Sequence, residues 1–450
     1  MTFFGRTLGF LKVSWGGRSP EQAIRRLGHD CGSDSIFAAG VAALLETFRP
    51  YLGRASNFGH LLAYLLGLMA DLKRKSIEPI ALAAGAAVRT LQEFLSFLDW
   101  DHEAANDHLQ RLVMDRHGCA RAIGVIDASG HAKQGRLTPG VARQWCGETG
   151  KVDNCVVGQH RLYSDHHPTN PFNGALSSDL FLPESWGQDA ERGRKAPIPE
   201  EVVHRPKWRM ALDQVKRAIA NGVRFWFLVF DEDYGKVPQF WFELDAMGQQ
   251  AVGEVPANFH IFAKRPAYRS TQKAHASKRV DNLCRFSPLF REQPWQRVTV
   301  KGATRGPIVW EIKMARVHLV VASPRPSRPT DRQYGWIVAR NPETGEIKYF
   351  ISNAAACVPL ADLLTAAFAR RQIELWFERA KQEAGLGTFE VRTYRSLLRH
   401  WFCSRLAMYF LAAQTQRLRG EKSADHAGTG GRGDQRLGLD DLDAYVALAG

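Results

Sequence analysis

Three acidic residues stand where a folded chain could bring carboxylates together. Asp127 ends the apolar run AIGVID, and Asp231 ends RFWFLVFD, the most apolar run of the sequence. Each run predicts a buried strand, and a carboxylate at the carboxyl end of such a strand lies at the sheet edge where open α/β sheets bind ligands. Glu374 lies on a predicted helix, on one face with Glu378 and Lys381.

Carboxylates that converge from two strands and a helix suit divalent cations. Mg²⁺ prefers oxygen ligands and keeps water or phosphate oxygens in its shell, and Mn²⁺ is a possible substitute. Two such ions can stabilise both the attacking and the leaving oxygen of a phosphoryl displacement. Lys381 is then placed to hold a phosphate of the DNA backbone. The alternative is that each Asp is only a turn residue or a helix cap, and that Glu378 pairs with a base on the helix surface.

The charge balance indicates a polyanionic partner. The 450 residues include 60 Lys and Arg against 46 Asp and Glu, a net charge of +14, and 45% are hydrophobic, which is ample for a buried core. Nucleic acid is the commonest such partner, and a merely solubilising charge is the alternative. Residues 262–340 contain 17 Lys and Arg but only four Asp and Glu. This segment is predicted to lie along DNA phosphates, with salt-dependent binding through Arg265, Arg269, Lys273, Lys278 and Arg279.

Other classes of protein are disfavoured. No apolar stretch reaches the roughly 18 residues of a membrane-spanning helix, and the basic, glycine-interrupted start does not resemble a signal peptide. The seven cysteines are scattered without a C-x-x-C pair, which predicts reduced thiols in a cytoplasm and no structural zinc site. The pair His166 and His167 is interpreted as part of a surface loop.

The first half of the chain divides into a helical part and a mixed part. Residues 33–118 have the spacing of helices only, and Ser76 is a predicted helix cap. The basic residues Lys73, Arg74 and Lys75 before it are either a phosphate-contacting helix end or a solvated turn. From 121 onward three strands form a predicted meander, AIGVID, VARQWC and NCVVGQHRLY. A long loop over 168–200 and the helix WRMALDQVKRAIANG are expected to follow.

The second half is predicted to be β-rich and then helical again. Short strand-like runs fill the segment up to 355, with PETG as a hairpin turn. One long amphipathic helix is expected over ADLLTAAFARRQIELWFERAKQEAGL, and a second follows it. The predicted divisions are an irregular N-terminus over 1–32, a helical DNA-binding domain over 33–118, the first part of a catalytic core over 119–240, a basic β-rich insertion over 241–357, a helical completion of the core over 358–419 and a flexible tail over 420–450.

Several longer motifs occur in one order over roughly residues 35–415. They are KRKSIEPIA, VIDASGHAKQG, GVARQWCGETGKVDNC, FDEDYG and IELWFERAKQEAGLGTFEVRTYRS. In these motifs the chain resembles insertion-sequence transposases of the DDE type, of the seven-oh-one family in the insertion-sequence-four-like superfamily. The resemblance implies an α/β ribonuclease-H-like catalytic core, interrupted by a β-rich insertion and preceded by an all-helical N-terminal domain.

The resemblance also implies roles for single residues. Asp127, Asp231 and Glu374 match the catalytic, metal-binding acids, and Lys381 matches the lysine seven residues after the glutamate. Tyr234 fits a D-x-x-Y pattern after the second acid. Asp233 is a rival metal ligand, because small residues are more usual between Asp231 and the tyrosine.

Further DNA contacts are implied near the glutamate and in the insertion. An arginine is expected about one turn before Glu374, where Arg370 fits the spacing and Arg371 is its neighbour. The tyrosine expected three residues earlier is absent, because residue 367 is Ala. Trp336 is a candidate for stacking on a DNA base in the insertion, and a tryptophan in the core of a strand is the alternative.

The hypothesis that follows is a Mg²⁺-dependent DNA transposase. It would bind the terminal inverted repeats of its element, cut at the ends and join the 3′-hydroxyls to target DNA. Its partners would be double-stranded DNA and, on that DNA, a second copy of the chain, in the cytoplasm of a bacterium at the nucleoid. The alternatives are a catalytically inactive, transposase-derived DNA-binding regulator and a two-carboxylate glycosidase, which the basic charge disfavours.

Overall fold

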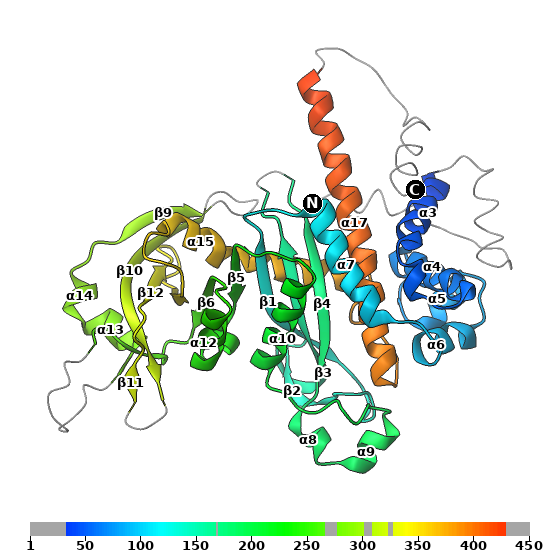
Figure 1. The fold of residues 1–450 in the computed structure, drawn as a ribbon, viewed down its shortest axis with the longest axis horizontal. Helices are drawn as coiled ribbons and strands as arrows, with labels where there is room; N and C mark the ends of the chain where they lie inside the picture. The colour runs from blue at the N-terminus through cyan, green and yellow to red at the C-terminus, as the bar shows by residue number, and fades with distance from the viewer. Residues whose placement is uncertain (1–32, 168–169, 266–276, 301–307, 323–326, 429–450) are drawn as a thin grey trace.

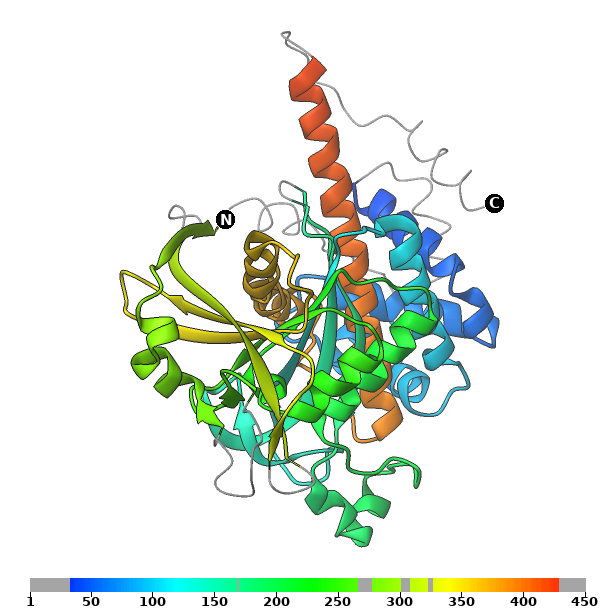
Figure 2. The same cartoon turned by 60° about the vertical axis from the view of Figure 1, so that its left-hand side comes forward.

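The computed structural model describes residues 33–167, 170–265, 277–300, 308–322 and 327–428. Its strands form one continuous sheet of 13 strands, and the two ribbon views show helices packed around the part of the sheet that contains β1 (Figures 1 and 2).

The strand that contains Asp127 and the strand that precedes Asp231 are neighbours in the sheet. β1 (Ile123–Ala132) pairs in parallel with β5 (Phe227–Phe230), and β5 pairs in parallel with β6 (Ala251–Val255). On its other side β1 pairs antiparallel with β3 (Lys151–Ser164). The buried run FLVF of β5 therefore lies in the middle of the sheet, as its apolar sequence predicts.

The hairpin expected between VARQWC and NCVVGQHRLY is present, but the predicted meander is wrong in its strand order, because β3 and not β2 (Ala142–Cys146) pairs with β1. β2 pairs antiparallel with the first part of β3. The prediction of a loop over 168–200 is wrong, because β4 (Asn173–Phe181) pairs antiparallel with β3 and is followed by α8 (Glu184–Gly187) and α9 (Ala190–Lys195). Asn, Gly and Ser are weak strand formers. Pairing with β3 and packing beneath α17 impose the extended form on them.

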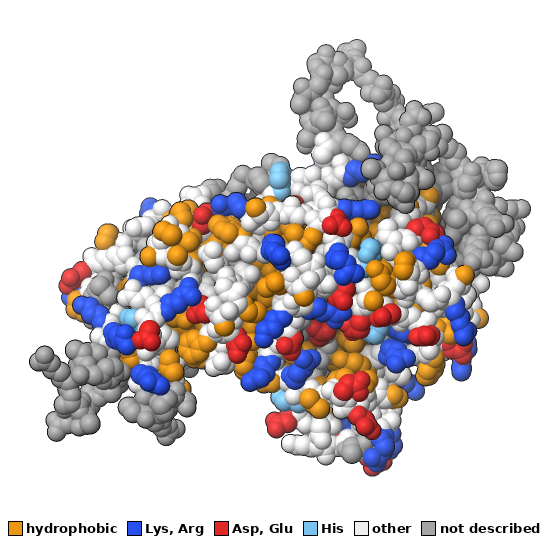
Figure 3. All heavy atoms as spheres, in the orientation of Figure 1, with side chains coloured by type: hydrophobic (Ala, Val, Ile, Leu, Met, Phe, Trp, Pro, Cys, Tyr) orange, Lys and Arg blue, Asp and Glu red, His pale blue; other side chains and the backbone are white. Residues whose placement is uncertain are grey.

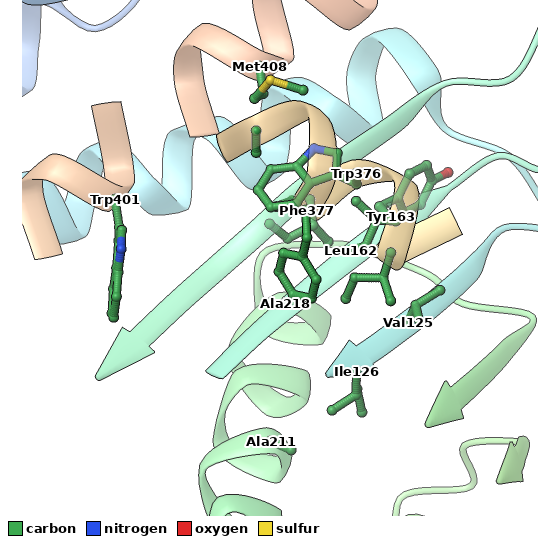
Figure 4. Packing of buried hydrophobic residues seen from close by; sticks show 14 of the residues in the cluster. Val125, Ile126, Leu162, Tyr163, Ala211, Ala218, Trp376, Phe377, Trp401 and Met408 are labelled. Carbon is green, nitrogen blue, oxygen red and sulfur yellow. The ribbon is translucent and has the colours of Figure 1, made fainter. Parts of the chain in front are cut away.

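Helices cover both faces of this sheet. Side chains of directly paired residues point to the same face, so Val125 of β1 and its partner Leu162 of β3 share one face. Figure 4 shows Trp376 and Phe377 of α16 (Arg371–Glu383) on that side, and Ile126 on the opposite side with Ala211 of α10 (Lys207–Ala220). We call these two sides the α16 face and the α10 face. Two further helices, α11 (Glu232–Gly235) and α12 (Pro238–Ala246), follow β5.

The C-terminal helices differ in two ways from the predicted ones. The single long helix is divided at Arg370, which joins α15 (Leu360–Ala369) to α16. α17 (Tyr394–Gly428) continues past residue 419 into the predicted tail, because Glu, Lys and Ala after Gly420 are good helix formers. Residues 429–450 lie outside the described part of the chain.

The β-rich insertion extends the same sheet. β13 pairs antiparallel with β6, so the insertion continues the sheet that holds the aspartates. The apolar runs IVWEIK and VHLVV, which predict two strands, both belong to the one strand β10. The predicted insertion over 241–357 includes β6, and its later elements are β7 (His260–Phe262), β8 (Lys278–Arg279), α13 (Val280–Phe286), α14 (Pro288–Arg291), β9 (Gln296–Val300), β10 (Ile308–Val321), β11 (Arg328–Pro329), β12 (Tyr334–Arg340) and β13 (Ile347–Ser352).

The described chain before β1 is helical. Its elements are α3 (Ser33–Glu46), the 3-10 helix η1 (Arg49–Tyr51), α4 (Ala55–Met69), α5 (Ile77–Ala83), α6 (Val88–Ser96) and α7 (His102–His117). α4, α6 and α7 pack on α17, and α3 and α5 pack on α4. The helices share one buried cluster with the sheet. That they form a separate DNA-binding domain stays a prediction. Among the described helices, none combines the length and the apolar character needed to cross a membrane.

Candidate active site

The sheet register brings Asp127 and Asp231 to the same level. Ile126 pairs with Phe230, so each aspartate is the next residue on two adjacent parallel strands. The sequence predicts that this strand ends at Asp127, but β1 continues to Ala132. Asp231 follows β5 directly and caps α11, where its Oδ1 accepts a hydrogen bond from the backbone N–H of Asp233 at 3.0 Å.

Arg370 connects Asp127 to Glu374. Its guanidinium lies 3.3 Å from Oδ2 of Asp127 and 2.9 Å from Oε1 of Glu374. Asp127 pairs with His160 in the sheet and so projects from the α16 face, toward the helix that carries Glu374. The Asp127 side chain is 15% exposed and that of Glu374 is 54% exposed. Asp127 is therefore the recessed member and Glu374 the solvent-facing one.

The aspartates are electrostatically strained as a pair. Burial, and then the charge of Asp231, raises the pKa of Asp127 to about 7, although Arg370 opposes the shift. Burial and the charge of Asp233 likewise raise the pKa of Asp231. Burial alone would lower the pKa of Arg370, but the surrounding carboxylates raise it. The site therefore favours an added positive charge next to Asp127 and Asp231.

The donor set fits a hard divalent cation, since carboxylate oxygens are the ligands that Mg²⁺ prefers. Within the described ranges, no three His, Cys, Asp or Glu side chains are gathered closely enough to hold an ion. Arg370 neutralises Asp127 and Glu374 in this arrangement. A cation bound by these two acids would take the place of the arginine as their partner.

Asp233 forms an ion pair with Lys236. Its carboxylate lies 2.6 Å from Nζ of Lys236. Burial works to raise the pKa of Asp233, but the hydrogen bond and charge of Lys236 lower it on balance. Asp231 directly follows the central strand, and the charge of Arg370 acts to lower its pKa. Asp231 is therefore better placed than Asp233 as the second metal ligand.

Tyr234 is buried and does not face DNA. Its hydroxyl donates to Oε1 of Gln159, whose amide nitrogen lies 3.4 Å from the backbone oxygen of Asp127. Gln214 of α10 donates to the backbone oxygen of Gln159 at 3.0 Å. Tyr234 thus links α11, which follows Asp231, to β3 and, through Gln159, to β1 at Asp127.

Two residues near the acids escaped the sequence reasoning. Gln159 is a buried polar residue within an apolar strand, and that contrast is the signal that could have identified it. Lys207, at the start of α10, lowers the pKa of both Asp231 and Asp233 against the larger effect of burial. Only the tertiary structure places Lys207 there, because no motif contains it.

Among the predicted phosphate contacts, Lys381 lies on the α16 face beyond Glu374. Its Cγ is 3.9 Å from the position that a Cβ would take at Gly387. Arg371 is exposed in the first turn of α16. Lys381 and Arg371 make no ion pair with residues in the described ranges, so both cations are available to phosphate.

The basic cluster before α5 is divided. Lys75 is buried, and its Nζ donates to the backbone oxygen of Glu383 at 2.8 Å, at the end of α16. Burial lowers its pKa. Arg74 pairs with Glu390 at 2.5 Å, and Lys73 remains exposed. The structure therefore favours a structural role for Lys75, which the spacing alone could not distinguish from a DNA contact.

Trp336 lies in the core of the insertion. It is buried and stacks on Phe290 with ring centroids 4.0 Å apart. The structure thus favours the alternative of a core tryptophan over base stacking.

The basic residues of the insertion are partly paired. Arg265 lies 2.7 Å from Asp331, and Arg279 lies 2.6 Å from Asp281. Lys278 is exposed, whereas Arg269 and Lys273 lie outside the described residues. On the described part of the face in Figure 3, Lys and Arg lie among Asp and Glu and form no single continuous patch.

Comparison with known proteins places the chain in a family. The family model described as DDE superfamily endonuclease matches residues 47–307, which is more than half of the chain. The chain therefore belongs to the DDE superfamily endonucleases, a family whose membership implies a ribonuclease-H-like fold. The mixed sheet β4-β3-β1-β5-β6 with helices on both faces fits that fold.

One relative shows which kind of DDE superfamily protein the chain resembles. The chain is 26% identical over 249 residues to the "Probable transposase for insertion sequence element IS701" of Microchaete diplosiphon. The match covers 55% of this chain and 60% of the relative. The resemblance to insertion-sequence transposases of the DDE type is thereby confirmed at the level of the family.

Proposed function

We propose that this chain is a DNA transposase that binds the terminal inverted repeats of its element, cleaves the DNA at the element ends and joins the 3′-hydroxyls to target DNA. The observation that supports it most directly is the pair of aspartates at one level of adjacent parallel strands, connected through Arg370 to Glu374. The kinship with a probable transposase supports the same reaction class. A dimer on DNA is part of the proposal, because two ends must be joined.

Asp127, Asp231 and Glu374 would hold Mg²⁺, with Mn²⁺ as a possible substitute. The ions would activate the attacking hydroxyl or water and stabilise the leaving oxygen. The chain's own residues position the reaction. The strand pairing fixes the two aspartates, and Tyr234 with Gln159 holds the backbone behind them. Lys381 and Arg371 of α16, the helix that carries Glu374, and Lys207 at the start of α10 would supply positive charge to a phosphate backbone.

Cleavage of a labelled duplex that contains the terminal inverted repeat tests the proposal. We expect wild-type protein to cut in the presence of Mg²⁺, and Asp127→Asn, Asp231→Asn and Glu374→Gln to bind the same duplex without cutting it. Asp233→Asn is the matched control, because Asp233 pairs with Lys236, and it should retain most of the cleavage activity.

Two results would contradict the proposal. Cleavage by any of the three acid variants at a rate near that of wild type would remove the acids from the reaction. Specific binding of the repeat by wild-type protein without excision of a plasmid-borne element in Mg²⁺ would instead favour the inactive, DNA-binding regulator.

A further inference from the structure

The β2–β3 hairpin exposes an apolar surface that the proposed cleavage reaction does not use. Trp145 is 64% exposed, and Val152, its direct partner in the antiparallel pairing, is 53% exposed. Directly paired side chains lie side by side on one face. We call Trp145 and Val152 the hairpin platform.

The register places this platform on the α16 face. Asp127 pairs with His160, and Val152 precedes His160 by eight residues along β3. Because side chains alternate along a strand, an even number of residues leaves Val152 on the same face as His160 and Asp127. The contour between these levels is at most about 26 Å at 3.3 Å per residue. The platform therefore follows the acids along one face of the sheet.

The opposite side of the hairpin is packed against the sheet. Cys146 and Cys155 are buried with Val157, and a Cβ at Gly130 would lie 3.0 Å from Cα of Cys146, a close approach that favours glycine. The turn residue Glu148 accepts a hydrogen bond from the N–H of Ala132 at 2.8 Å. The inner side of the hairpin, with Cys146 and Cys155, is thus packed on the α10 side of β1, and its outer surface is the one with Trp145.

Hydrogen bonds connect the outer surface to the region of Lys381. Asn154 donates to the backbone oxygen of Lys133 at 2.6 Å, and Nζ of Lys133 donates to the backbone oxygen of Gly387 at 3.0 Å. Gly387 in turn adjoins the side chain of Lys381. Two hydrogen bonds therefore join the outer surface of the hairpin to the part of the chain next to Lys381.

The charge next to the platform points to the kind of partner. Arg143 is exposed, pairs with Asn154 in the register and so lies on the same face as Trp145. It makes no ion pair with any residue that the structure describes. A flat indole beside an unpaired guanidinium suits a partner with planar apolar groups and phosphates, which is the chemistry of unpaired nucleotides. Bases inside a duplex do not expose their faces for stacking.

We propose that the hairpin platform, together with Arg143, binds an unpaired segment of the DNA strand within about eight nucleotides of the cleaved phosphate, given a spacing of about 3.4 Å per nucleotide. This rests on the proposed function for the position of that phosphate. Trp145 stacks on a base, Val152 widens the apolar surface beneath it, and Arg143 meets the phosphate.

Binding of two fluorescein-labelled duplexes of equal sequence tests this proposal. One duplex is blunt, and the other has a single-stranded extension of eight thymidines. Loss of one stacked base corresponds to roughly 5- to 150-fold weaker binding. We expect Trp145→Ala to weaken binding of the extended duplex by a factor in this range and to leave the blunt duplex nearly unchanged. Trp145→Phe should retain most of the affinity for the extension.

Phe97→Ala is the matched control, because Phe97 is 70% exposed and lies at the end of α6, away from the hairpin. It should not change the preference for the extension. The proposal is overturned if Trp145→Ala leaves that preference intact, or if it weakens both duplexes equally. It is also overturned if Trp145→Ala changes only the oligomeric state in light scattering without DNA, since the platform would then contact a second copy of the chain.

The same experiment separates this inference from the proposed function. Asp127→Asn should lose cleavage and keep the preference for the extension. If wild-type protein prefers the extension through Trp145 but never cleaves in Mg²⁺, the transposase assignment fails and the inference stands. If wild-type protein cleaves and Trp145 has no effect on binding, the inference alone fails.

Discussion

Replacement of Tyr234 by Phe removes a single hydroxyl from behind the candidate active site. That hydroxyl donates to Oε1 of Gln159, and both side chains are buried. The amide of Gln159 also faces the backbone oxygen of Asp127 at 3.4 Å. The substitution therefore leaves a buried acceptor without its donor and loosens the group that supports the strand at Asp127.

The structure sets the size of the effect. A buried polar atom that loses its partner costs about 1–3 kcal/mol, and water has little access at a tyrosine whose exposed fraction is 1%. We expect the free energy of unfolding to fall by that amount in Tyr234→Phe. Gln159→Met should cost a similar amount, because it strands the tyrosine hydroxyl instead. The double variant should cost less than the sum of the two, because neither stranded atom remains.

Urea unfolding followed by tryptophan fluorescence measures these differences, and end cleavage should fall in the same variants. Tyr349→Phe is the control, because the Tyr349 hydroxyl makes no hydrogen bond to a described residue, and its effect should stay below about 0.5 kcal/mol. Additive effects of Tyr234→Phe and Gln159→Met would refute the reasoning, since two residues that share a buried hydrogen bond must be coupled.

Three further predictions concern stability and metal binding. Arg399 of α17 is buried and donates to the backbone oxygens of Phe94, Leu98 and Trp100, at the end of α6 and just after it. Arg399→Met should therefore lower the free energy of unfolding in urea by at least about 3 kcal/mol. Arg395→Met, at an exposed site of the same helix, should cost little. Burial and Asp231 raise the pKa of Asp127 to about 7, so the folded protein binds more protons than the unfolded chain between about pH 4 and 7, and stability is lost as the pH rises through that window. In thermal unfolding, Asp127→Asn should therefore stabilise the protein at pH 8, by an amount that shrinks toward pH 4. An equal effect at both pH values would contradict this. Mg²⁺ should raise the melting temperature of wild-type protein by binding the folded state, and an undiminished rise in the double variant Asp127→Asn/Asp231→Asn would place the ion elsewhere.

Local sequence patterns were sufficient for the strands and helices that are strongly apolar. The runs AIGVID and RFWFLVF predict β1 and β5, and their register brings Asp127 and Asp231 together. Weak patterns failed where packing overrode them. β4 contains Asn, Gly and Ser, and β3 together with α17 makes it a strand. The division of the long helix at Arg370 is likewise absent from its amphipathic spacing.

Side-chain roles were harder to predict than elements, because residue type does not reveal burial. Trp336 and Trp145 are both tryptophans of predicted strands, yet Trp336 stacks on Phe290 in the core and Trp145 lies on the surface. Lys75 is a basic residue of the kind that contacts DNA, but it donates a hydrogen bond to the backbone oxygen of Glu383 at the end of α16. Which of two like residues meets solvent depends on the elements that pack over it, and those come from distant parts of the chain.

The sequence by itself determined the strongly apolar strands and the family and indicated three candidate acids, because hydrophobic periodicity and ordered motifs are local properties of the chain. Only the tertiary structure decided that Arg370 joins Asp127 to Glu374 and that Tyr234 supports Asp127 through Gln159. The contact of Arg370 with Asp127 joins residues 243 positions apart in the chain, and that of Tyr234 with Gln159 joins residues 75 apart. They exist because the parallel pairing of β1 with β5, and the packing of α16 on one face of that sheet, bring distant residues to a single edge.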